Sequence, residues 1–227
     1  MTHQTVPTTF DTAKALFRGH CGLLRTSEAL RLGIHPRTLY AMRDAGVLEQ
    51  LSRGLYRLAE FPPLGAPDLV AVARKVPAGV VCLISALAFY ELTTQIPHAV
   101  YIALARGVAP PRLDYPPVRI FWFTGEAFTA GIAIHTLDRV SVPVYTPEKT
   151  LADCFKYRNK LGFDVALEAL KLYRQRQRMK LDELLRFARI CRVEKVMRPY
   201  LAGVYGGERA RGIDPLELEG LQGLRSV

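Results

Sequence analysis

Residues Leu24–Leu58 have the sequence LRTSEALRLGIHPRTLYAMRDAGVLEQLSRGLYRL, which decides the fold of the N-terminal part of the chain. Its first half predicts two short helices, Thr26–Leu32 and Pro36–Ala45. Threonine is a favourable N-cap for the first helix, and glycine at position 33 permits the left-handed turn that must follow it. Proline suits the first position of the second helix, where its missing N–H costs nothing. The pattern therefore predicts a helix-turn-helix.

The second half of this stretch predicts a basic β-hairpin, with strands at Val47–Leu51 and Leu55–Leu58 and a turn at 52–54. A helix-turn-helix followed by a hairpin is typical of a winged helix. In helix-turn-helix proteins the second helix usually enters the major groove of duplex DNA. The sequence therefore predicts double-stranded DNA as a partner; a winged helix that makes only protein contacts is the alternative.

The side chains that we expect to contact DNA lie on the free faces of the second helix and the hairpin. Leu39 and Met42 share the apolar face of that helix, so its other faces are open. Arginine can bridge two acceptors of guanine or bind phosphate, and threonine or tyrosine can reach phosphates or thymine methyls. The expected DNA-binding residues are Thr26, Arg37, Thr38, Tyr40, Arg43, Arg53 and Arg57.

Residues 59–67, AEFPPLGAP, contain three prolines and a glycine, which is typical of a boundary between domains. We therefore predict a winged-helix domain at 1–60, a linker at 61–67, a larger mixed α/β domain at 68–205 and a loose tail at 206–227. The fold class is α+β, with a mostly antiparallel sheet followed by C-terminal helices. The expected strands of that sheet are His98–Leu104, Val118–Thr124, Gly131–Leu137 and Val140–Tyr145. Ser85 is expected to cap a helix that ends at Leu92.

The charge of the chain is +10 and is unevenly distributed. Residues 149–211 contain 16 basic and 7 acidic side chains. This excess favours an anionic partner, although a solvated basic surface would give the same count. Within this block Lys149, Lys156, Arg158 and Lys160 are expected on free helix faces, where they could bind a partner or an anion.

The cysteines and the lack of a long apolar segment indicate the cellular compartment in which the protein is expected. The four cysteines are scattered and form no CxxC pair, so we expect reduced thiols and no metal site. No apolar run approaches the roughly 18 residues of a membrane span, and the N-terminus has no signal-peptide pattern. A cytoplasmic location without a membrane partner is expected.

Three motifs occur in one order along the chain: SRGLYRL at Ser52–Leu58, SALAFYEL at Ser85–Leu92 and YTPEKTLADCFKYR at Tyr145–Arg158. In this combination the chain resembles the AbiEi antitoxins of bacterial type IV toxin–antitoxin systems, over residues 10–203. The resemblance implies operator binding by the N-terminal domain, autoregulation of the antitoxin–toxin operon and a role in phage defence. It also implies that the C-terminal domain counteracts a nucleotidyltransferase toxin, directly or indirectly. Cooperative binding or dimerisation on inverted repeats is a further expectation.

Catalytic motifs are not expected, and neither is a cofactor. The acidic and basic residues near Glu148 suggest a nuclease, but Glu148 and Lys149 are adjacent and cannot mimic an E-x-K pair on a strand. The sequence contains no Gly-Ser pair of the kind nucleotidyltransferases use, and no P-loop, GxGxxG or HExxH. Three hypotheses remain: a repressor-antitoxin, a ligand-responsive regulator and a DNA-targeted nuclease.

Overall fold

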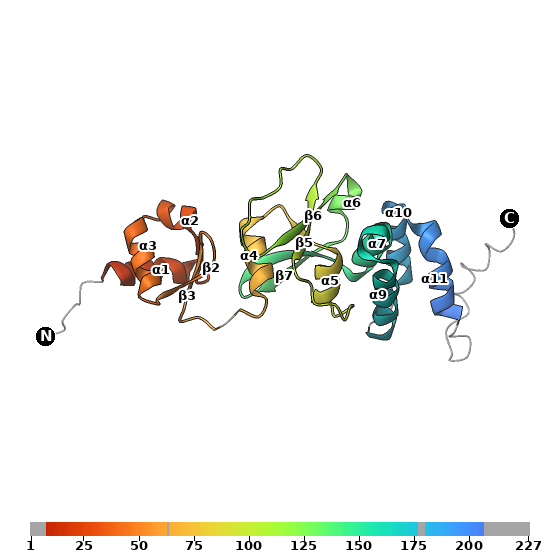
Figure 1. The fold of residues 1–227 in the computed structure, drawn as a ribbon, viewed down its shortest axis with the longest axis horizontal. Helices are drawn as coiled ribbons and strands as arrows, with labels where there is room; N and C mark the ends of the chain where they lie inside the picture. Colours follow the sequence, from red (N-terminus) through yellow and green to blue (C-terminus); the bar gives the residue numbers. More distant parts are fainter. Residues whose placement is uncertain (1–7, 63, 177–179, 207–227) are drawn as a thin grey trace. The chain divides into compact units, whose positions relative to one another are not determined.

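The computed structural model describes residues 8–62, 64–176 and 180–206 (Figure 1). It is an α+β fold, as the sequence predicts: a winged helix is followed by a mixed sheet and then by helices. The chain forms two compact units. The first unit comprises residues 1–81, 98–122 and 133–144, and the second comprises 82–97, 123–132 and 145–227. The tail expected at 206–227 lies outside the described residues except for its first position.

The described helices are α1 Thr9–Gly19, α2 Thr26–Arg31, α3 Pro36–Asp44, α4 Pro67–Lys75, α5 Leu83–Phe89, α6 Glu126–Thr129, α7 Pro147–Lys156, α8 Arg158–Leu161, α9 Phe163–Arg176, α10 Leu181–Ile190 and α11 Glu194–Gly206. The described strands are β1 Leu23–Arg25, β2 Leu48–Ser52, β3 Leu55–Leu58, β4 Val80–Val81, β5 Val100–Ala105, β6 Val118–Phe123, β7 Ile132–Leu137 and β8 Val140–Tyr145. None of these helices is long and apolar enough to cross a membrane.

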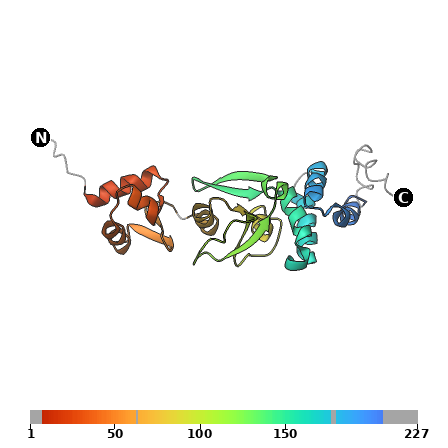
Figure 2. The same ribbon diagram turned by 90° about the horizontal axis from the view of Figure 1, so that it is seen from above.

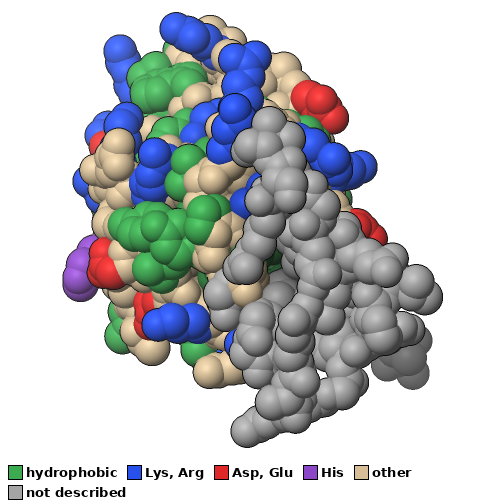
Figure 3. Space-filling view, turned by 90° about the vertical axis from the view of Figure 1, so that its right-hand side faces the viewer, with side chains coloured by type: hydrophobic (Ala, Val, Ile, Leu, Met, Phe, Trp, Pro, Cys, Tyr) green, Lys and Arg blue, Asp and Glu red, His purple; other side chains and the backbone are tan. Residues whose placement is uncertain are grey.

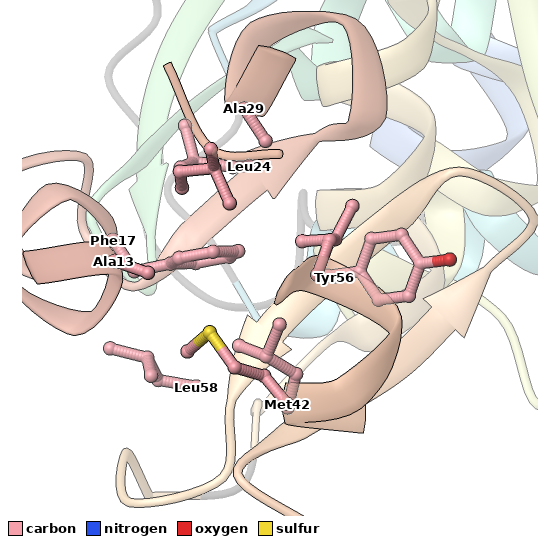
Figure 4. Close-up of a cluster of buried hydrophobic side chains, with 10 residues drawn as sticks. Ala13, Phe17, Leu24, Ala29, Met42, Tyr56 and Leu58 are labelled. Carbon is pink, nitrogen blue, oxygen red and sulfur yellow. The ribbon is translucent and has the colours of Figure 1, made fainter. Parts of the chain in front are cut away.

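The winged helix is built around one apolar core to which α1, α2, α3 and the three-stranded sheet β1-β3-β2 all contribute (Figure 4). Phe17 of α1, Leu39 and Met42 of α3 and Leu58 of β3 are all fully buried in it. Burying one such large apolar side chain contributes about 1.5–3 kcal/mol. The core therefore fixes which face of α3 is turned inward and which is left open.

The second sheet has five strands in the order β6-β5-β4-β8-β7. Its short central strand β4 pairs antiparallel with β5 and parallel with β8. Helix α4 packs on β5 through the apolar cluster of Val72, Val76, Val100, Ile102 and Leu104. The sheet is thus mixed at its centre, where β4 is flanked by one partner of each direction.

The second unit is mainly helical, and α7, α9 and α10 lie side by side in both ribbon views (Figures 1 and 2). Helix α7 is the central helix of this group, because it packs against α5, α9, α10 and α11. Eight of its ten residues, Glu148–Phe155, are consequently buried.

One local expectation, the helix cap at Ser85, is wrong. Helix α5 begins at Leu83 after an N-cap at Cys82, so Ser85 lies inside the helix and is not its cap. Trp122 on β6 is 46% exposed. Its Nε1 donates a hydrogen bond to the carbonyl of Val108.

Candidate nucleic-acid interface

Helix α3 has a fixed start and a fixed orientation, as a recognition helix requires. His35 is its N-cap, and His35 Nδ1 accepts a hydrogen bond from the amide of Arg37 at 3.2 Å. Pro36 follows at the first helical position. Leu39 and Met42 are buried, as the sequence predicts, so the face that carries Arg37 and Tyr40 is exposed.

The side chains on this open face differ in how strongly they are already engaged. Arg37 and Tyr40 are exposed, and Thr38 is half-buried. Arg43 forms an ion pair with Asp44 at 2.7 Å, and its guanidinium lies 5.3 Å from the centre of the Tyr40 ring. The hydrogen bond and charge of Asp44 raise the pKa of Arg43. Arg43 would therefore have to exchange a carboxylate for a phosphate, whereas Arg37 is exposed at the N-terminal end of the helix.

The turn between β2 and β3 presents Arg53, whose side chain is 85% exposed. The turn is tied to the start of α2, because the amide of Thr26 donates to the carbonyl of Gly54 at 2.9 Å. The predicted N-cap role of Thr26 is wrong by one position: Arg25 is the N-cap residue, and its amide donates to the Glu28 carboxylate at 2.8 Å. Thr26 itself is half-buried at the first helical position.

Arg57 does not fit the DNA contact predicted for it. It is only 4% exposed. Its guanidinium donates to Glu49 at 2.9 Å and to the carbonyl of Pro62. The register of the hairpin explains this, since Glu49 and Arg57 are directly opposite on β2 and β3. Arg57 therefore stabilises the hairpin, and the cross-strand pairing of Glu49 with Arg57 is the signal that could have shown it.

The prediction that Lys149 lies on a free helix face is also wrong. Its side chain is fully buried and forms an ion pair with Asp153, at 2.5 Å, one turn further along α7. The ammonium also lies 4.2 Å from the ring centre of Tyr145 and 4.9 Å from that of Phe123. Cys191 donates its thiol hydrogen to the other oxygen of Asp153 at 3.2 Å. Lys149 is thus part of the core and is not open to a partner.

The other charged residues of this motif divide between the core and the surface. Burial raises the pKa of Asp153, an effect that Lys149 and Cys191 oppose. Glu148 is buried and accepts a hydrogen bond from Tyr173 at 2.6 Å. Lys156 and Lys160 are exposed as expected. Arg158 is half-buried and donates to the carbonyl of Phe155. The side of the molecule that Figure 3 presents carries many Lys and Arg side chains and several apolar areas.

Metal-binding clusters of three or more His, Cys, Asp or Glu side chains are absent from the described part of the chain. Glu148, Lys149 and Asp153 are buried and have partners inside the fold: Lys149 and Asp153 pair with each other, and Glu148 accepts from Tyr173. The residues on which a nuclease would depend are therefore engaged in the fold.

The fold and the open face of α3 define a winged-helix protein joined to a second α+β part. Residues 11–59 match the family model described as "Transcriptional regulator, AbiEi antitoxin". This match confirms, over the N-terminal segment, the resemblance that the sequence motifs indicate.

The solved structures extend the comparison to most of the chain. The crystal structure of the RV2827C protein from Mycobacterium tuberculosis is similar with a TM-score of 0.51 and 15% identity. The similarity covers 87% of this chain and 82% of that one. At this identity it shows that the two share a fold. The search of curated proteins gives no match.

Proposed function

We propose that the winged helix binds operator DNA, with α3 in the major groove and the β2–β3 turn on the phosphate backbone. The observation that carries this proposal is the exposed face of Arg37 and Tyr40 on a helix that His35 and the core hold in place. The match of residues 11–59 to antitoxin regulators supports the same function.

We propose further that the chain represses its own operon, and that residues 68–205 counteract a nucleotidyltransferase toxin encoded beside it. The motif resemblance and the family match of the N-terminal segment support this role. Lys156, Lys160 and Arg158 remain the residues proposed for partner binding in this part, with Lys149 removed because it is buried. Cooperative binding or dimerisation on inverted repeats belongs to the same proposal.

Binding experiments on two arginines test the DNA assignment. Arg37→Ala should relax or abolish sequence preference, because this side chain faces the bases. Arg53→Ala should weaken binding to all duplexes similarly and reduce the salt slope by about one unit, because this side chain faces phosphate. Arg106→Ala, which removes an exposed arginine outside the winged helix, is the matched control. Unchanged operator affinity in both test variants would refute the assignment.

The proposed role against the toxin is tested in cells that carry the adjacent toxin gene. The full chain with Arg37→Ala and Arg53→Ala together should lose repression of the operon while still protecting cells from the toxin. Loss of protection together with repression, in a protein that melts at the wild-type temperature, would count against separate roles. A ligand-responsive regulator would instead show operator affinity that changes with a small molecule and no effect on a toxin.

A further inference from the structure

Arg25 lies beside the β2–β3 turn, although it precedes that turn by more than twenty residues in the sequence. It ends β1, where it is paired with Leu55 at the start of β3. The neighbouring hydrogen bond from the amide of Thr26 to Gly54 holds β1 and the turn together. Arg25 and Arg53 therefore belong to the same small region of the winged helix.

The C-terminal end of α4 reaches the same region. Arg74 donates to Glu28 at 2.7 Å and to the carbonyl of Leu23 at 3.4 Å, which joins the end of α4 to β1 and α2. Lys75 is the next residue and the last of α4. Glu28 is already engaged there, by Arg74 and by the amide of Arg25.

The electrostatics of Lys75 show which charges surround it. Partial burial lowers its pKa, and the positive charges of Arg25 and Arg53 lower it further, while Asp114 acts in the opposite direction. Lys75 thus lies close enough to Arg25 and to Arg53 for each of them to repel it. An anion at this position would relieve that repulsion.

A carboxylate from elsewhere in the first unit is present at this position. Asp114, in the segment between β5 and β6, lies with its Oδ2 3.6 Å from Nη1 of Arg53. Both side chains remain open to solvent, at 85% for Arg53 and 67% for Asp114. An exposed pair at this separation is weak and easily exchanged, and one carboxylate beside three cations leaves the region positively charged.

We propose that Arg25, Arg53 and Lys75 form one phosphate-binding cluster for duplex DNA, and that Asp114 occupies it as an internal competitor when no DNA is bound. The inference rests on the proposed DNA binding and deepens it in two respects. It adds a residue from outside the winged helix, Lys75, to the DNA interface. It also gives the segment between β5 and β6 a role in setting DNA affinity.

The first test neutralises the competitor in the full chain. Asp114→Asn should tighten binding to a duplex that contains the operator by about 3–10-fold near 0.1 M salt, because a phosphate no longer displaces a carboxylate. Glu126→Gln, which removes one exposed carboxylate of α6, has the same effect on net charge and should change affinity much less. Equal tightening in both variants would show a general charge effect and would overturn the proposal.

The second test removes the cations. Lys75→Gln should weaken binding about 3–10-fold on specific and random duplexes alike, and should reduce the salt slope by about one unit. In an Arg53→Gln background, Asp114→Asn should give little further gain in DNA affinity, because the ion pair between Arg53 and Asp114 is already absent. Melting temperatures of all variants establish that they remain folded.

The outcomes separate this inference from the proposed function. If the wild-type chain and every variant fail to bind duplex DNA, the proposed function fails. If the wild-type chain binds and Arg37→Ala weakens it, but Asp114→Asn and Lys75→Gln leave affinity and salt slope unchanged, the cluster alone is refuted.

Discussion

Helices α3 and α7 begin with similar sequences, but α3 has an exposed face whereas α7 is mostly buried. Each begins with proline directly after a capping side chain, and each carries several charged residues within about ten positions. In α3 Arg37 is exposed, and Arg43 is half-buried and paired with Asp44 near the surface. In α7 Lys149 and Asp153 are fully buried and paired with each other. A basic residue on a helix is therefore not by itself evidence for a binding surface.

The difference arises from what surrounds each helix. Helix α3 packs on one apolar core with only one face, through Leu39 and Met42. Helix α7 is enclosed by α5, α9, α10 and α11, so its charged side chains must find partners inside. A lysine and an aspartate four residues apart can meet on one helix, and the rings of Tyr145 and Phe123 receive the ammonium.

The largest effect should follow from breaking the buried pair of α7. Lys149→Ala leaves the Asp153 carboxylate buried without its cation, and should reduce the free energy of unfolding by about 3–5 kcal/mol. Urea unfolding measures this change. Lys156→Ala on the exposed end of the same helix is the control and should stay within about 0.5 kcal/mol of wild type.

Replacing both members of the pair sharpens the same point. Lys149→Met with Asp153→Leu should cost less than Lys149→Ala alone, because no uncompensated charge remains. If the double variant loses as much unfolding free energy as the two single variants together, the two residues contribute independently. An uncompensated buried charge would then not be the cause of the loss.

A smaller loss of stability is expected at the second buried carboxylate of α7. Tyr173→Phe removes the hydroxyl that donates to Glu148 and should cost about 1–3 kcal/mol of unfolding free energy. Tyr40→Phe on the open face of α3 removes an exposed hydroxyl and should change stability very little. Equal costs for the two substitutions would remove the contrast between the helices.

The smallest effect concerns the start of α3. His35→Ala removes the acceptor of the Arg37 amide and should cost about 0.5–2 kcal/mol, whereas His35→Asn should keep the cap. Thermal unfolding compares the two. If alanine and asparagine give the same melting temperature, the cap contributes nothing to the helix that the proposal places on DNA.

Local sequence patterns predict the fold of the winged helix well. Apolar spacing and turn residues place α2, α3 and the hairpin within a residue or two, and they place Leu39 and Met42 in the core. The strand β8 is predicted with its correct bounds, since alternation of apolar residues between two clear turns is a strong signal.

Tertiary partners are what local patterns miss. Lys149 looks like a free base because its burial depends on helices far away in the sequence, which periodicity within α7 does not report. Arg57 looks like a DNA contact because its partner Glu49 becomes apparent only once the register of the hairpin is known. The approach of Lys75 and Asp114 to the β2–β3 turn has no sequence signal at all.

The measurement that tests the central claim most directly is a salt titration of the full chain on an operator duplex and on a random duplex, repeated with Arg37→Ala. We predict that the wild-type chain prefers the operator, and that Arg37→Ala loses about 1–3 kcal/mol of this discrimination while it keeps its melting temperature. A wild-type chain that binds both duplexes equally, or an Arg37→Ala variant with undiminished preference, would contradict the assignment of α3 as the helix that contacts the bases.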